Sequence, residues 1–156
     1  DNLISSLCAE GATVIYTTGK AKQVCNAKKK YASDILISIH CNASPKSAPN
    51  GLHIYYADNA VAGKKLAEAV SKNFKKNINS NTGIKSDGEG QHSSIGILRA
   101  NSNDRQIPSI LIEMGFMSNP TDIANIDSKS QRQKAMDQVT QSIIEYLNPP
   151  KPKKTK

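Results

Sequence analysis

The chain has 156 residues, of which 37% are hydrophobic, and its 21 Lys and Arg outnumber 13 Asp and Glu to give a formal net charge of +8. A chain of this length can bury a core without a disulfide framework or a structural metal, and its hydrophobic content excludes wholesale disorder. Its longest hydrophobic run is far shorter than the ~18 residues that a membrane-spanning helix needs, so the sequence predicts no membrane span.

The first third of the chain alternates predicted helices and strands. Hydrophobic residues recur with helical spacing over 3–7, and Gly11 is typical of the end of a helix. A strand over 13–17 and a second helix over about 21–32 follow. The run 35–40 is nearly all hydrophobic, as in a strand covered on both faces, so we expect it in the centre of a sheet.

The alternation continues along the chain. Residues 52–56 form the next predicted strand, and an amphipathic helix is predicted over 60–78. The segment 79–94 is polar and contains glycines without any period, which predicts a long surface loop. Two further short strands are predicted over 95–98 and 109–113.

The last predicted helix has its hydrophobic residues between 135 and 147 and ends before Pro149. Strands that alternate with helices predict an α/β fold with a mostly parallel sheet and helices on both faces. We expect a single domain over 1–148, followed by a basic Pro/Lys linker or tail over 149–156.

Two segments are rich in lysine and contain no acidic residue. Five lysines lie within 20–30, and four lie within 149–156. Such segments are either solvated surface or the binding site of a polyanion, such as an anionic lipid or an acidic cell-wall polymer. No aromatic residues are interleaved with these lysines, so we expect no nucleic-acid partner.

His40 and Glu113 each stand at the end of a predicted strand. In an open α/β sheet, ligands collect beyond the carboxyl ends of the strands. Hydrophobic residues flank Glu113 in the sequence, and a buried carboxylate needs a positive partner, a proton or a metal. Glu113 is therefore either a general base or half of an ion pair at the sheet edge. His40 is either a metal ligand or a hydrogen-bonded structural group.

Four segments in this order and spacing resemble the successive motifs of the zinc-dependent N-acetylmuramoyl-L-alanine amidases, the type 3 family of peptidoglycan hydrolases. They are residues 37–43 (ISIHCNA), 51–56 (GLHIYY), 97–99 (ILR) and 112–122 (IEMGFMSNPTD). The similarity extends from about residue 3 to residue 147, and the last segment is its most specific part.

The resemblance implies a sheet of about six strands and a catalytic zinc bound by His, Glu and His. It implies hydrolysis of the amide between the lactyl group of N-acetylmuramic acid and L-alanine of the stem peptide. His40 matches the last zinc ligand, and Glu113 matches the catalytic carboxylate. Zinc lowers the pKa of a bound water toward about 7, and a carboxylate can then accept its proton. The partner implied is peptidoglycan, outside the cytoplasm, for an autolysin, a sporulation hydrolase or a phage lysin.

The chain departs from the family at several positions. The resemblance places the first strand and the other two zinc ligands, a His and a Glu, before Asp1, and one imidazole cannot hold zinc tightly. His53 stands where relatives usually have Glu, and it is either a structural residue or a replacement ligand. Arg99 is either a ligand for a substrate carboxylate or part of a surface ion pair. The alternative function is a degenerate module that binds cell wall or a partner without cleaving it.

Overall fold

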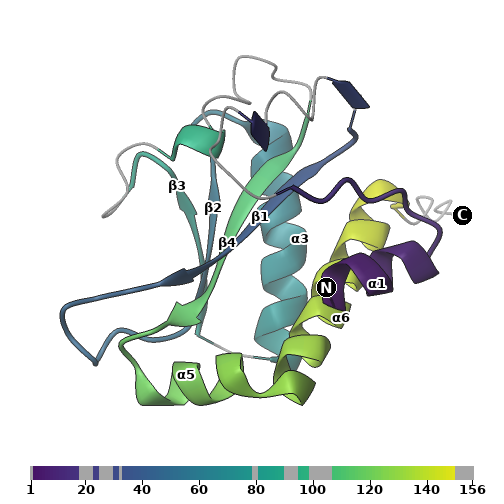
Figure 1. The fold of residues 1–156 in the computed structure, drawn as a ribbon. Coiled ribbons are helices and arrows are strands. Elements are labelled where there is room, and N and C mark those ends of the chain that lie inside the picture. Colours follow the sequence, from purple (N-terminus) through teal and green to yellow (C-terminus); the bar gives the residue numbers. More distant parts are fainter. Residues whose placement is uncertain are drawn as a thin grey trace, which may run out of the picture.

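The sheet of this protein has four strands in the part of the chain that the structure, a computed structural model, describes (Figure 1). The described residues are 2–17, 23–24, 30–31, 33–78, 81–89, 95–98 and 107–149. The strands lie in the order β1 (Leu36–Asn42), β4 (Ser109–Phe116), β2 (Leu52–Tyr56) and β3 (Thr82–Ser86). Most of the helix expected over 21–32 and the basic tail from residue 150 lie outside these residues.

The sheet is mixed. β1 runs parallel to β4, and β2 runs parallel to β3, but β2 is antiparallel to β4. The expected α/β class is confirmed, whereas the mostly parallel sheet of about six strands is not what the described residues form. β1 was expected in the centre of the sheet, but among the described strands it is an edge strand. Its Ile39 accordingly keeps 42% of its surface exposed.

Three predictions from local sequence are wrong. Residues 13–17 join no ladder among the described strands, because a β-prone run forms a strand only where a partner strand is available. Residues 96–98 form a helical turn, in which the N–H of Leu98 donates to the Ile95 carbonyl at 3.0 Å. The expected loop over 79–94 contains β3, whose short and polar sequence is held by pairing with β2.

The helices agree with the predictions from hydrophobic spacing more closely than the strands do. They are α1 (Asn2–Ala9), α3 (Val61–Asn77), α5 (Pro120–Asp127) and α6 (Lys129–Leu147). α1 ends as expected at Gly11, whose φ is +82° and whose N–H donates to the Cys8 carbonyl at 3.0 Å. α6 begins before its hydrophobic stripe, because Ser128 caps it by accepting from the N–H of Gln131. None of the helices in the described ranges is long and apolar enough to cross a membrane.

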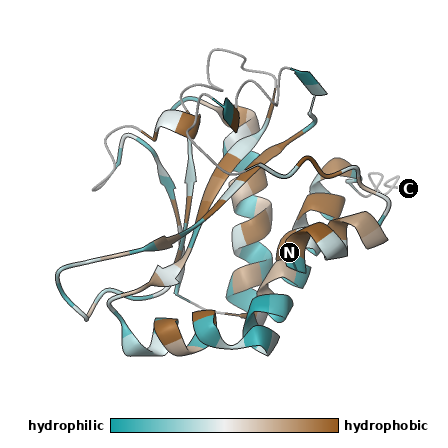
Figure 2. Ribbon diagram, viewed as in Figure 1, coloured by the Kyte–Doolittle hydropathy of each residue, from teal (hydrophilic) through white to brown (hydrophobic). Residues whose placement is uncertain are grey.

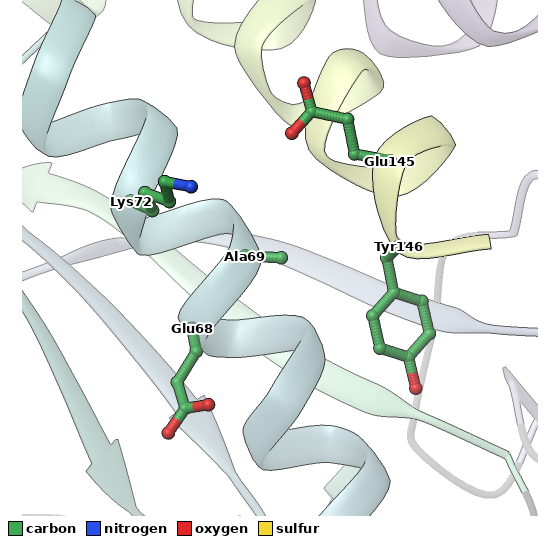
Figure 3. A pocket seen from close by; sticks show the side chains of 5 residues that line it. All are labelled: Glu68, Ala69, Lys72, Glu145 and Tyr146. Carbon is green, nitrogen blue, oxygen red and sulfur yellow. The ribbon is translucent and has the colours of Figure 1, made fainter. Parts of the chain in front are cut away.

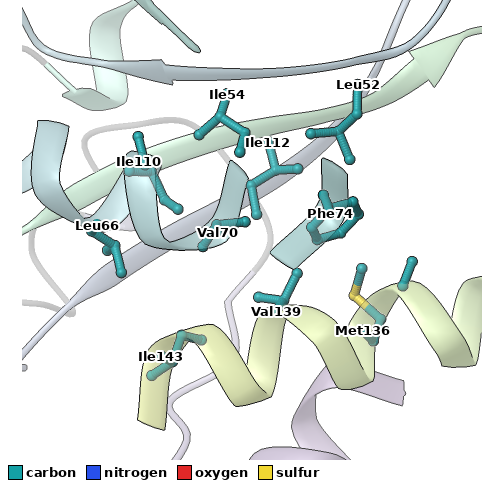
Figure 4. Close-up of a cluster of buried hydrophobic side chains, with 12 residues drawn as sticks. Leu52, Ile54, Leu66, Val70, Phe74, Ile110, Ile112, Met136, Val139 and Ile143 are labelled. Atoms are coloured by element: carbon teal, nitrogen blue, oxygen red, sulfur yellow. The ribbon is translucent and has the colours of Figure 1, made fainter. Parts of the chain in front are cut away.

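The main hydrophobic core lies between one face of the sheet and the pair of helices α3 and α6. Figure 4 shows Ile54 and Ile112 from the sheet facing Val70 and Phe74 of α3, with Val139 of α6 beside them. All five side chains are fully buried. Burial of a side chain of this size contributes roughly 1.5–3 kcal/mol, so this core provides much of the stability of the fold. Figure 2 shows the corresponding hydrophobic residues on β4 and along α3.

The opposite face of the sheet has its own smaller cluster. Tyr55 of β2 and Leu111 of β4 pack there against Leu98 from the helical turn. The long described helices therefore cover one face, and on the other face the described cover is this turn. Because the helix expected over 21–32 lies mostly outside the described residues, the expectation of helices on both faces stays a prediction.

Candidate functional site

A histidine, a glutamate and a second histidine form a row across three neighbouring strands. Glu113 of β4 is in register with His40 of β1 on one side and with His53 of β2 on the other. Residues in register on adjacent strands point to the same face of a sheet, and residues two apart on one strand do too. Leu111 and Tyr55 belong to the smaller cluster, so the His40–Glu113–His53 row lies on the face away from α3.

Glu113 is the buried member of the row, with 7% of its surface exposed. It lies inside β4, which continues to Phe116, and not at the strand end that the sequence predicted. Burial, followed by the negative charge of Glu113, raises the pKa of the Tyr55 hydroxyl and of the Cys41 thiol. Both groups are therefore within electrostatic reach of the carboxylate. Glu113 thus lies in a middle strand, in register with two histidines, and not at an edge of the described sheet.

His40 is exposed where β1 becomes irregular. The pairing of β1 with β4 shifts register between His40 and Asn42, and beyond this irregularity the Asn42 carbonyl accepts from the N–H of Met117 at 2.8 Å. A bulge re-aims the side chains beside it and ends regular pairing. The sequence predicted that the strand ends at His40, whereas β1 continues to Asn42.

His53 is half-buried and completes the row. Its ring meets the rings of Phe116 and Tyr55 edge-on, with centroid distances of 5.4 Å and 6.4 Å. Its buried Nδ1 has no hydrogen-bond partner among the described residues. Aromatic packing of this kind supports a structural role.

We expect protonation of His53 to destabilise the folded chain. Burial first, and then the positive charge of Lys85, lower the pKa of this imidazole from 6.5, and Asp122 opposes them. The unfolded chain therefore binds the proton more readily, so stability falls as pH drops through the unfolded pKa of about 6.5 toward the lower folded pKa. In urea unfolding, the wild type should lose more stability between pH 7.5 and pH 5.5 than His53→Gln does. Equal losses of stability in the two proteins would contradict a lowered pKa of His53 in the folded chain.

The segment after β4 holds the site together through Asp122, a residue that the sequence analysis did not single out. Asp122 is 4% exposed, and one oxygen, Oδ2, accepts from the backbone N–H groups of Gly51 at 2.9 Å and Phe116 at 2.8 Å. These donors lie next to β2 and in β4, the strands that carry His53 and Glu113. Asn119 caps α5 by accepting from the N–H groups of Thr121 and Asp122, so the sequence Ser-Asn-Pro-Thr-Asp was a readable signal for a helix start.

Gly51 allows this contact to form. Its φ is +95°, a conformation that residues with a Cβ rarely adopt, and a Cβ there would collide with the backbone oxygen of Asn81.

Asp87 is a second, fully buried acid that accepts from the N–H groups of Asp58 at 3.0 Å and Ile95 at 3.3 Å. Asp87 thereby fixes the start of the turn that carries Leu98 over the smaller cluster.

The donor types and the grouping of the row decide whether it can hold a metal ion. His40 and Glu113 are donors that zinc accepts, but a catalytic zinc needs three protein ligands. Nowhere in the described ranges do three His, Cys, Asp or Glu side chains come close enough together to hold a metal ion. The described residues therefore do not complete a zinc site, and further ligands would have to come from outside them. Arg99 also lies outside the described residues.

Known proteins resemble this chain in both sequence and fold. The family model described as N-acetylmuramoyl-L-alanine amidase matches residues 1–145. The "Probable cell wall amidase LytH" of Staphylococcus aureus is 31% identical over 125 residues, which are 80% of this chain and 39% of that protein. The protein of the same name from Staphylococcus saprophyticus is 33% identical over 140 residues, covering 88% of this chain and 42% of its own length. The chain thus spans about two fifths of the length of these relatives.

Solved structures with the same fold belong to similarly described proteins. The N-acetylmuramoyl-L-alanine amidase AmiC2 of Nostoc punctiforme superposes with a TM-score of 0.79 at 22% identity. The catalytic domain of CwlV, an N-acetylmuramoyl-L-alanine amidase from Bacillus (Paenibacillus) polymyxa var. colistinus, gives a TM-score of 0.77 at 24% identity. Each match covers 94% of this chain and 79% of the other. At this identity the likeness shows a shared fold.

Proposed function

This chain belongs to the N-acetylmuramoyl-L-alanine amidase family, and from that premise we propose that it hydrolyses the amide between the lactyl group of N-acetylmuramic acid and the L-alanine of the stem peptide in peptidoglycan. The observation that carries the proposal is the buried carboxylate of Glu113, which lies beside the accessible imidazole of His40 on the second face of the sheet. The test is incubation with purified cell wall, followed by measurement of newly released L-alanine amino groups.

Glu113 is the general base in this proposal. Its carboxylate takes a proton from the attacking water and returns it to the amine that leaves as the new N-terminus of the stem peptide. Leu111 and Tyr55 of the smaller cluster lie beside the row, and Glu113 itself is 7% exposed, so little water surrounds this carboxylate. The two hydrogen bonds that Asp122 Oδ2 accepts from Gly51 and Phe116 are called here the Asp122 bridge. This bridge keeps β2 and β4, and therefore His53 and Glu113, at a fixed separation.

The proposed activity also depends on zinc. His40 supplies one imidazole ligand, and the remaining ligands come from outside the described residues. Because those residues do not complete the site, the proton transfers above are assigned to Glu113 alone, and no step is assigned to the metal.

We expect His40→Ala to lose bound metal. The reason is that an imidazole contributes one of about three protein ligands in a catalytic zinc site, and loss of one ligand weakens binding strongly. Metal analysis of the complete domain after dialysis should find about one zinc per domain, and the variant should hold much less. His53→Gln is the matched control, because it removes the other imidazole of the row and should retain zinc. Unchanged zinc content in His40→Ala would exclude the ligand role of His40.

The relatives described as cell wall amidases support a place of action outside the cytoplasm, at the cell wall. Acidic wall polymers are the partners proposed for the basic surface of the chain, whose net charge is +8. The lysine-rich segments singled out in the sequence lie largely outside the described residues.

A degenerate wall-binding module is the second candidate function. It is favoured by the incomplete ligand set of the described residues. Such a module would sediment with purified cell wall without releasing L-alanine amino groups, whereas the amidase would release them.

A further inference from the structure

The outer surface of α3 is strongly basic. Its exposed lysines lie within about one third of the helix circumference, and we call them the lysine face: Lys64, Lys65, Lys72, Lys75 and Lys76. Glu68 is the acidic residue within this sector. With a rise of 1.5 Å per residue, the lysine face extends for about 18 Å along the helix.

The stability of α3 explains only part of this arrangement: Lys75 and Lys76 in the last turn suit the negative end of the helix macrodipole, and Glu68 is four residues from both Lys64 and Lys72. Lys64 and Lys65 lie near the N-terminus of the helix, where the macrodipole favours negative charge, and the first turn holds no acidic residue. Lys72 and Lys76 are four residues apart, a spacing at which like charges repel. No ion pair or side-chain hydrogen bond engages the lysine face within the described part of the chain. A polyanion that contacts this surface would relieve the repulsion between its lysines.

A groove borders the lysine face where α3 packs against α6. Its volume is about 610 Å³, and its lining residues are Glu68, Ala69, Lys72, Glu145 and Tyr146. Figure 3 shows Lys72 on α3 and Glu145 on α6 near one end of the groove, with the Tyr146 ring further along. The carboxylates can accept hydrogen bonds from hydroxyl groups, and the aromatic ring offers an apolar contact for a carbon backbone.

Glu145 is held as an ionised acceptor. Hydrogen bonds from Gln141 and Asn73, and the charges of Lys72 and Lys76, lower the pKa of its carboxyl. The donor distances are 2.9 Å from Gln141 Nε2 and 3.4 Å from Asn73 Nδ2. The groove thus combines a cation for phosphate with fixed acceptors for hydroxyl groups.

We propose that the lysine face and the adjoining groove of α3 bind a flexible polymer of hydroxyl-bearing phosphodiesters, the polyol-phosphate class of anionic wall polymer. Phosphates of the polymer lie along the lysines, and its hydroxylated carbon chain passes through the groove. Tyr146 is the aromatic residue that lines the groove, and a single ring does not provide a stack for successive bases, which separates this ligand from nucleic acid. α3 covers the sheet face opposite the His40–Glu113–His53 row, so docking leaves that row open. The choice of a wall polymer rests on the proposed function.

The test measures binding to poly(glycerol phosphate) as a function of salt, using the full chain with Glu113→Gln in every sample so that hydrolysis plays no part. Substitution of Lys65, Lys72 and Lys76 by Gln should weaken binding about tenfold or more in 50 mM salt. It should also reduce the slope of log K against log salt by about 2, since each lysine of a flexible polyanion complex releases about 0.7 counterion. The control replaces Lys46, Lys129 and Lys134 by Gln, which removes the same charge from other exposed positions, and should change binding less than about twofold.

Equal weakening in the two triple variants would show that net charge alone attracts the polymer, and would overturn the proposal. Single-stranded DNA with the same number of phosphates should bind more weakly than poly(glycerol phosphate), and equal or tighter DNA binding would also overturn it. Wall hydrolysis by the chain with Glu113 intact is measured separately. A protein that hydrolyses wall but shows no polymer binding loses only this inference, whereas one that binds without hydrolysis loses only the amidase proposal.

Discussion

Glu113→Gln is expected to lower the release of L-alanine amino groups from purified cell wall by at least about 10²–10⁴-fold, the usual contribution of a general base. Gln has the shape of Glu and fits the same buried position, but its amide cannot accept the proton of the attacking water. The folded structure, measured by circular dichroism and urea unfolding, should therefore survive the substitution. Bound metal should also remain, because the ligand role is assigned to His40.

Glu89→Gln is the matched control for this experiment. Glu89 is an exposed glutamate in the turn after β3, so its substitution makes the same chemical change away from the row. Wall hydrolysis by this variant should equal that of the wild type. If Glu113→Gln hydrolyses wall as fast as Glu89→Gln, Glu113 is not the base.

Asp122→Ala is expected to lower the free energy of unfolding by about 3–5 kcal/mol. The substitution removes the acceptor of two buried N–H groups, and each hydrogen bond to a charged group is worth roughly 1.5–3 kcal/mol. The Gly51 and Phe116 amides would then remain buried without their acceptor. Urea unfolding monitored by circular dichroism gives the difference directly, and a loss this large is a substantial fraction of the stability of a small domain.

Two further variants distinguish the loss of the Asp122 hydrogen bonds from the loss of a negative charge. Asp122→Asn keeps an oxygen that can accept from both N–H groups, so it should lose clearly less stability than Asp122→Ala. Asp127→Ala removes an exposed carboxylate at the end of α5 and should change stability by less than about 0.5 kcal/mol. Equal effects of the Ala substitutions at positions 122 and 127 would show that the bridge contributes little.

Much of the site was available from the sequence. The hydrophobic residues around Glu113 predicted a buried carboxylate, and the short hydrophobic run before His40 predicted a strand with His40 at its end. The structure places them in register on adjacent strands. The third member of the row, His53, was noted only for its departure from the family, because nothing in its local sequence says which strand lies beside β2.

The role of Asp122 could not be predicted from the local sequence. Its neighbours Asn119 and Pro120 signal a helix start, and the sequence analysis included the segment in the family resemblance without assigning it a task. Its hydrogen bond to Gly51 joins residues 71 positions apart, a contact that local spacing does not encode. The positive φ of Gly51 is likewise required by the approach of Asn81, a residue distant in the sequence.

The sequence by itself determined the elements whose pattern is local: α1, α3, the hydrophobic part of α6, and the strands that contain His40 and Glu113. Helical periodicity and short hydrophobic runs express contacts within a few residues or a whole buried face, so they are readable without knowing the partner. The tertiary structure alone decided the antiparallel direction of β2, the strand character of β3, the helical turn at 96–98 and the Asp122 bridge. These features depend on which backbone N–H and carbonyl groups, distant in the sequence, form hydrogen bonds with each other when the sheet is buried. A strand obtains its hydrogen bonds only from its neighbours.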